Sequence, residues 1–192
     1  LIAEILAESA TWAQLDNAEI VTAEYVKKAE EEKAYRLSMY QEKMNELLDN
    51  NTIMIATDGY CVGKINGLAV LDMGDYSFGS PTRITATTYM GKSGIVNIEK
   101  EAEMSGPTHN KGVQIITGYL GRMYAQKMPL SLSCRIAFEQ NYNGIDGDSA
   151  SSTELYCILS SLSEIPVNQS LAVTGSVNQC GEIQAIGGVT HK

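Results

Sequence analysis

The chain of 192 residues has little positive charge, only two histidines and no long apolar run. It carries 14 Lys and Arg residues against 23 Asp and Glu, which gives a net charge of −9. Because a nucleic-acid surface needs clustered positive charge to meet the phosphates, this balance argues against a nucleic-acid partner. No apolar run approaches the roughly 18 residues of a membrane-spanning helix. The N-terminus also lacks the basic stretch that precedes the apolar part of a signal peptide.

The cysteines are few, far apart and form no C-x-x-C pair. They are Cys61, Cys134, Cys157 and Cys180. This spacing favours neither a metal site nor a disulfide framework, so we expect reduced thiols, no bound metal and a cytoplasmic location. The phosphate-binding pattern G-x-x-x-x-G-K-[ST] is absent as well. The chain therefore cannot bind ATP by that route.

The first 50 residues differ from the rest in their sequence pattern, which indicates two helices. A short helix is expected to end near Trp12, and a longer one to begin after Thr22, whose side-chain oxygen would cap it. The longer helix has an apolar stripe at helical spacing and is expected to end at Asp49 and the two asparagines that follow. The stripe comprises Leu37, Tyr40, Met44 and Leu47. We therefore assign residues 1–50 to a helical segment.

From residue 51 onward, β-rich runs alternate with glycine and proline turns. Apolar residues at helical spacing predict one helix over about 109–126 and another directly after Ser149. Residues 131–138 alternate apolar and polar side chains, as a strand with one buried face does. Further strands are expected at 52–56, 69–73, 83–89, 94–98, 171–174 and 182–185. The pattern predicts a single α+β domain over 51–192, preceded by the helical segment.

Ser149 and Lys192 are the candidate reactive residues. Ser149 lies just ahead of a predicted helix, and Lys192 follows a Gly-Gly pair. A serine hydroxyl is a poor nucleophile until a neighbour takes its proton, and a lysine amine held neutral can do this. Neither histidine has a Ser-His-Asp setting. His109 is expected to be a helix-start residue, and His191 would point to the opposite face from Lys192 on adjacent strand positions.

A purely structural role for Ser149 and Ser151 is also open at this point. A serine ahead of a helix is most often a cap. Ser151 and Glu154 match the capping-box pattern, in which two side chains satisfy the first backbone N–H groups of a helix. Taken alone, therefore, the residues leave both a catalytic and a capping role open.

Three blocks around these residues resemble the proteolytic domain of the Lon family of ATP-dependent serine proteases. The blocks are FEQNY at 138–142 with GIDGDSAS at 144–151, LAVTGSV at 171–177 with GEI at 181–183, and IGGV at 186–189 with Lys192. Upstream, GKINGLAV at 63–70 and FGSPTRITA at 78–86 resemble the B-type branch of that family. Asp148 stands where many Lon proteases have proline, in a form that fits the B-type branch.

The resemblance implies that Ser149 is the nucleophile and Lys192 the general base. It places Thr174 in the position of the family threonine whose hydroxyl orients the lysine amine. Backbone N–H groups near Asp148 and Ser149, at the helix start, would stabilise the oxyanion of a tetrahedral intermediate. Asp146 would either line the substrate cleft or satisfy turn amides.

The resemblance further implies a serine endopeptidase that cuts unfolded or damaged proteins in protein quality control. A fused ATPase using ATP and Mg would feed it, and the subunits would assemble into a ring, as a hexamer. Residues 1–50 would then be the end of the AAA+ lid subdomain, and 51–192 the protease domain, truncated at its C-terminus relative to the family. The alternative is a catalytically inactive module for assembly or interaction. The intact pair of Ser149 and Lys192 favours the enzyme.

Overall fold

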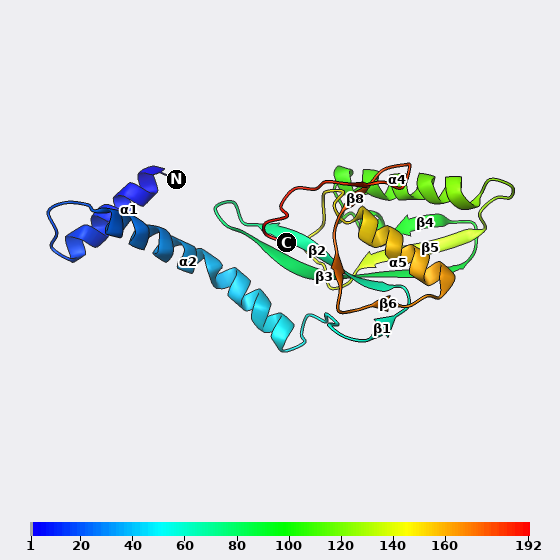
Figure 1. Cartoon of the computed structure of the whole chain (residues 1–192), viewed down its shortest axis with the longest axis horizontal. Helices are drawn as coiled ribbons and strands as arrows, with labels where there is room; N and C mark the ends of the chain where they lie inside the picture. The colour runs from blue at the N-terminus through cyan, green and yellow to red at the C-terminus, as the bar shows by residue number, and fades with distance from the viewer. Residues whose placement is uncertain (1) are drawn as a thin grey trace. The chain divides into compact units, whose positions relative to one another are not determined.

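The computed structural model describes residues 2–192, which form two compact units. The first comprises the chain up to residue 50 together with residues 72–77, and the second comprises residues 51–71 and 78–192. Figure 1 shows helices alone in the N-terminal part of the ribbon, and strands mixed with helices in the rest. This mixture confirms the predicted α+β class.

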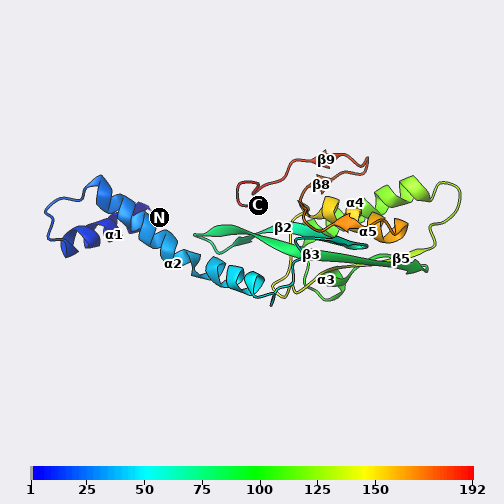
Figure 2. The ribbon, with the colours of Figure 1, turned by 60° about the horizontal axis from the view of Figure 1, so that its bottom comes forward.

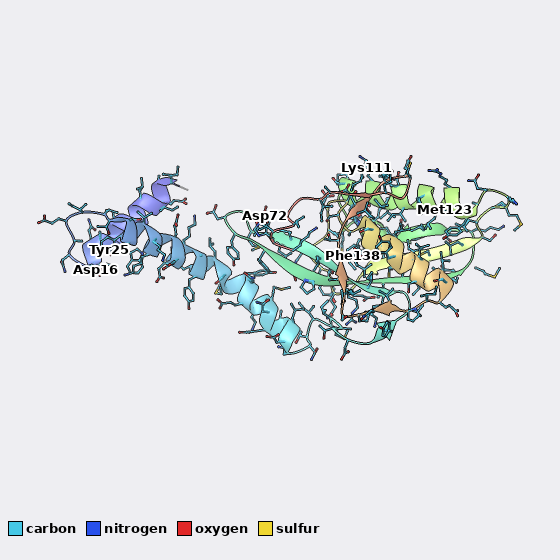
Figure 3. All side chains as sticks on the ribbon, in the orientation of Figure 1. Asp16, Tyr25, Asp72, Lys111, Met123 and Phe138 are labelled. Atoms are coloured by element: carbon cyan, nitrogen blue, oxygen red, sulfur yellow. The ribbon has the colours of Figure 1, made fainter. Side chains whose placement is uncertain are left out.

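The first unit contains two helices, α1 (Ile2–Leu15) and α2 (Ala23–Asp49). Thr22 occupies the N-cap position of α2 as expected, but its side chain makes no capping hydrogen bond. At the turn between the helices, Asp16 and Tyr25 lie together (Figure 3). Burial, together with the charge and hydrogen bond of Asp16, raises the pKa of Tyr25. Helix α1 ends at Leu15 and so continues past Trp12, where the sequence predicted its end.

Side chains join the two helices at several points. Lys28 Nζ lies 4.1 Å from the centre of the Trp12 ring, a cation–π contact. Further along, Arg36 Nη2 donates to Glu8 Oε1 at 2.5 Å. Such exposed ion pairs contribute at most about 1 kcal/mol each. Ala13 and Ala29 are also buried in this helical pair.

The second unit is organised around a five-stranded sheet with the order β4-β5-β3-β2-β7. Strands β3 and β5 pair antiparallel from Ile84 opposite Phe138 to Met90 opposite Leu132. Strand β4 runs parallel to β5, and β7 runs parallel to β2. The bounds are β2 (Lys64–Asp72), β3 (Ser77–Met90), β4 (Gly94–Asn97), β5 (Leu132–Phe138) and β7 (Ala172–Val173).

Two short antiparallel pairs lie outside this sheet. They are β1 (Tyr60–Cys61) with β6 (Val167–Asn168), and β8 (Ser176–Val177) with β9 (Ile183–Gln184). The sequence did not indicate β1, β6 or β8, because runs of two residues are too short to show an alternating pattern.

Helices cover the sheet on both faces. Figure 2 shows α4 (Pro107–Tyr124) and α5 (Ser151–Ser163) on one face and the single turn α3 (Ile98–Glu101) on the other. The alternating apolar residues of β5 point into the resulting core, as predicted. The buried core comprises Ile65, Ile84, Ala86, Ile116, Leu120, Leu132, Cys134, Ile136, Phe138, Leu155, Cys157, Ile158 and Val177. None of the helices within residues 2–192 is long and apolar enough to span a membrane.

The strand predicted at 52–56 was wrong, because this segment is turn and irregular chain. Side-chain amides bind its backbone in place of a neighbouring strand. Gln140 donates to the carbonyl of Thr52 and accepts from the N–H of Met54, each at 2.8 Å. Asn66 Nδ2 donates to the carbonyl of Ala56 at 2.7 Å. The β-rich composition was therefore overridden by partners far away in sequence.

Candidate active site

Ser149 lies in the turn between β5 and α5, two residues before α5 begins. Its carbonyl oxygen accepts from the backbone N–H of Gly175 at 2.7 Å and from Thr174 Oγ1 at 3.1 Å. The turn leading to it contains Gly147 at φ +91°, a conformation that favours glycine. The segment between β7 and β8 thus fixes the backbone of Ser149.

The side chains of Ser149, Thr174 and Lys192 meet at this turn. Lys192 Nζ lies 2.9 Å from Ser149 Oγ and 3.0 Å from Thr174 Oγ1. Because the Thr174 hydroxyl donates to the carbonyl of Ser149, its oxygen can accept a proton of the Lys192 amine. Partial burial lowers the pKa of Lys192. The structure therefore brings together three of the residues selected from the sequence.

The chain carrying Lys192 passes directly over Gly79 of β3. A Cβ atom at Gly79 would overlap the carbonyl oxygen of His191 and lie 3.2 Å from the Cα of Lys192. The segment is a turn, in which the N–H groups of His191 and Lys192 both point to the carbonyl of Gly188. The strand geometry expected for His191 and Lys192 was therefore wrong. The missing side chain at Gly79 is what allows the amine to reach Ser149.

For the peptidase activity that the sequence resemblance implies, we expect Gly79→Ala to lower kcat by at least about 10-fold, because displacements of about 1 Å in a reacting group can reduce rates about 100-fold. The added methyl group must push the backbone of residues 191 and 192 away from β3. Gly118→Ala in α4 is the matched control, since a Cβ there meets no atom within 4 Å. Steady-state kinetics of both variants test this, and equal rates would contradict the role of Gly79.

Asp148 is held on the side of the turn that faces β8. Its Oδ2 accepts from Ser176 Oγ at 2.9 Å, and its carbonyl accepts from the N–H of Ser151 at 3.0 Å. Within residues 2–192, the backbone N–H groups of Asp148 and Ser149 have no hydrogen-bond acceptor. These two donors are therefore free to bind a ligand.

Asp146 satisfies the backbone at the start of α4. Its Oδ1 accepts from the N–H of Thr108 at 3.0 Å and from that of His109 at 3.1 Å. Hydrogen bonds from the N–H groups of Gly147, His109 and Thr108 lower the pKa of Asp146. The N-cap of α4 is Gly106, which has no side chain, and a Cβ there would overlap the Asp146 carboxyl. Binding backbone amides, one of the two roles left open for Asp146, is thus observed. Asp146 also lines a cavity with Gly106 and Tyr142, and the binding of substrate there stays a prediction.

The predicted capping box was wrong. Helix α5 has Ala150 at its N-cap and no side-chain cap. Ser151 Oγ instead accepts from the N–H of Val177 at 2.9 Å, and Glu154 Oε1 lies 3.0 Å from His109 Nε2. All of these side chains are buried, so partners from other elements replace the local pattern. His109 was expected only to start a helix, and the sequence carried no signal for its buried partner.

A cavity lies between α4 and the loop that joins β8 to β9. Lys111 contributes to it from the outer surface of α4 (Figure 3), and the loop contributes Asn178 and Gln179. In the described part of the chain, no three His, Cys, Asp or Glu side chains gather in a group that could hold a metal ion.

Two family descriptions match this chain. The Lon protease (S16) C-terminal proteolytic domain matches residues 41–192, and the archaeal LonB AAA+ ATPase LID domain matches residues 1–36. These matches confirm the resemblance seen in the sequence, including its B-type character.

The chain is also similar to several curated proteins. It is 34% identical over 190 residues to a putative Lon protease homolog of Escherichia coli, which covers 98% of this chain and 32% of that protein. A putative Lon protease homolog of Haemophilus influenzae is 36% identical over 74% of the chain and 24% of its own length. An archaeal Lon protease of Archaeoglobus fulgidus is 31% identical over 94% of the chain and 28% of its own length.

The chain spans a third or less of the length of these relatives. Because the proteolytic-domain description matches most of the chain, and the Escherichia coli protein is 34% identical over nearly all of it, the chain belongs to the Lon (S16) protease family.

Proposed function

We propose that this chain is the catalytic unit of a serine endopeptidase in which Ser149 is the nucleophile and Lys192 the general base. The supporting observation is the distance of 2.9 Å between Lys192 Nζ and Ser149 Oγ. This lies within the hydrogen-bonding reach that proton transfer requires. Membership of a protease family points to the same reaction class.

Lys192 must be neutral to accept the proton. An unperturbed lysine has a pKa of about 10.4, and burial disfavours its charged form. Burial lowers the pKa of Lys192 in this site, and within residues 2–192 no ion pair joins its amine to an acidic side chain. Both features favour the free amine.

Thr174 orients the lone pair of this amine. One N–H of the neutral amine donates to Thr174 Oγ1, at 3.0 Å, which directs the lone pair toward the hydroxyl of Ser149. Ser149 Oγ then attacks the substrate carbonyl carbon as its proton passes to Lys192 Nζ. Lys192 returns that proton to the leaving amine as the peptide bond breaks, and water hydrolyses the acyl-enzyme by the same route.

The free N–H groups of Asp148 and Ser149 would bind the oxyanion of the tetrahedral intermediate. They precede α5, whose dipole adds positive potential at its N-terminus. In serine proteases the loss of one such donor raises the barrier by about 3–4 kcal/mol. This assignment accounts for two donors that no protein group uses.

The alternative is an inactive Lon-like module that serves only assembly or interaction. Such a module would have no need for a partly buried lysine amine with two hydroxyl partners. A serine-directed fluorophosphonate reagent distinguishes the two functions. We expect it to modify Ser149, found by peptide mass spectrometry, and to stop hydrolysis of a fluorogenic peptide. A hydrolysing preparation with unmodified Ser149 would contradict the assignment.

We further propose that the substrates are unfolded or damaged cytoplasmic proteins, delivered by an ATPase that uses ATP and Mg. The match to an ATPase LID description at residues 1–36 supports such a link. The chain has no G-x-x-x-x-G-K-[ST] sequence, so its own residues do not fit ATP. We therefore assign no catalytic step to the nucleotide within this chain.

We expect the intact protein to assemble as a closed ring, with six subunits. A ring encloses the nucleophile, so that folded proteins are excluded and only unfolded chains reach Ser149. Light scattering at micromolar concentration with nucleotide present measures the assembly mass. A monomer under those conditions would contradict the ring.

A further inference from the structure

His109 contacts the chain on both sides of Ser149. Its backbone N–H donates to Asp146 Oδ1 at 3.1 Å, three residues before Ser149. Its ring Nε2 lies 3.0 Å from Glu154 Oε1, five residues after Ser149 on α5. One residue of α4 thus binds both ends of the segment that presents the nucleophile.

The ring of His109 is held in one orientation. Asn97 Oδ1 accepts from the N–H of Glu99 at 3.1 Å, which turns the amide nitrogen of Asn97 toward His109 Nδ1, 3.3 Å away. An amide nitrogen can only donate, so Nδ1 accepts and Nε2 carries the proton. Nε2 therefore donates to Glu154. The ring also packs edge-on against Phe138, with 5.3 Å between the ring centres.

Burial makes this contact hard to replace. His109 is 1% exposed and Glu154 is fully buried, so water cannot substitute for either partner. Burial raises the pKa of Glu154. Burial alone would lower the pKa of His109, but the hydrogen bond and charge of Glu154, with the charges of Glu99 and Asp146, outweigh it and raise that pKa. Loss of the ring would leave a buried carboxyl group without its donor.

We propose that His109 is a positioning residue for Ser149, an inference that rests on the proposed serine peptidase function. It holds α5 through Glu154 and the preceding turn through Asp146. The segment between them then presents Ser149 Oγ to Lys192 Nζ in one geometry. Because substrate need not touch His109, its loss acts on kcat and leaves KM nearly unchanged.

The test compares, in the intact protein, two substitutions of His109 whose side-chain amides differ in length. His109→Gln can still donate to Glu154, whereas His109→Asn is too short to reach it. Active sites are first titrated with the fluorophosphonate reagent, so that kcat is expressed per reactive serine and misfolded protein is not counted. We expect His109→Asn to lower kcat per titrated site by at least about 10-fold, with KM within about 2-fold. His109→Gln should stay within about 3-fold of wild type.

A second variant keeps the test informative in the case that His109→Asn does not fold. The double substitution His109→Phe with Glu154→Leu removes both polar groups together, and such apolar replacements of buried pairs often preserve stability. We expect it to fold and to show the same 10-fold loss per titrated site. Ser160→Ala is the control: it removes a buried hydroxyl, which bonds the carbonyl of Ile165 at the far end of α5, and should lower the melting temperature alone.

Wild-type kcat per titrated site in His109→Asn or in the double variant would overturn the positioning role. A rate for His109→Gln as low as that of His109→Asn would do the same. The proposed function is tested separately by the wild-type protein. If that protein hydrolyses peptides through Ser149 while the His109 variants keep full rates, only the positioning role fails.

Discussion

Ser149→Ala is expected to lower kcat for peptide hydrolysis by at least about 10³-fold, because removal of a serine nucleophile leaves only binding and oxyanion stabilisation. In the structure Ser149 Oγ contacts Lys192 Nζ, and the backbone of the turn is fixed by Gly175 and Thr174. Those backbone contacts survive the substitution. The variant should therefore fold normally while losing its chemistry, which hydrolysis of a fluorogenic peptide and thermal unfolding measure together.

Ser152→Ala is the matched control for this variant. Ser152 lies on the first turn of α5, and its buried Oγ has no hydrogen-bond partner within the described residues. Removal of that hydroxyl leaves nothing unpaired, so hydrolysis should stay within about 2-fold of wild type and stability should not fall. Retained turnover in purified Ser149→Ala would remove Ser149 from the mechanism.

The pH dependence of hydrolysis should report the state of Lys192. Burial lowers its pKa, so the neutral amine forms at a lower pH than for a free lysine. A general base acts only when deprotonated, and activity should therefore rise with pH to a plateau, with a midpoint below about 10.4. A histidine base would instead give a midpoint near 6.5.

Lys192→Arg should lose at least about 10³-fold in kcat at every pH from about 5 to 10. A guanidinium group stays protonated over this whole range and cannot accept the proton of Ser149. It keeps much of the length of lysine but is always charged, so the variant tests whether a group that can become neutral is needed at residue 192. Lys127→Arg, at an exposed lysine beyond α4, is the control and should keep the wild-type profile. Near-normal rates for Lys192→Arg would exclude Lys192 as the base.

The local sequence pattern was sufficient to predict much of the fold. The alternation along β5 predicted its buried face, and helical spacing predicted α4 and α5 to within a few residues. These elements each bury one regular face, and a regular face leaves a period in the sequence. The family motifs were equally local, because short runs around Ser149 and Lys192 carry them.

Only the tertiary structure decided the geometry around Ser149. Gly79 and Lys192 lie far apart in the chain, and the missing Cβ of one matters only where the other crosses it. Glu154 satisfied a capping pattern in the sequence, yet folding buried it against His109 of another helix. A buried carboxyl group must find a donor wherever the fold supplies one, and that free-energy requirement outweighs a local cap. Sequence alone therefore determined which residues could react. Long-range packing determined the distances between those residues and the contacts that hold them in place.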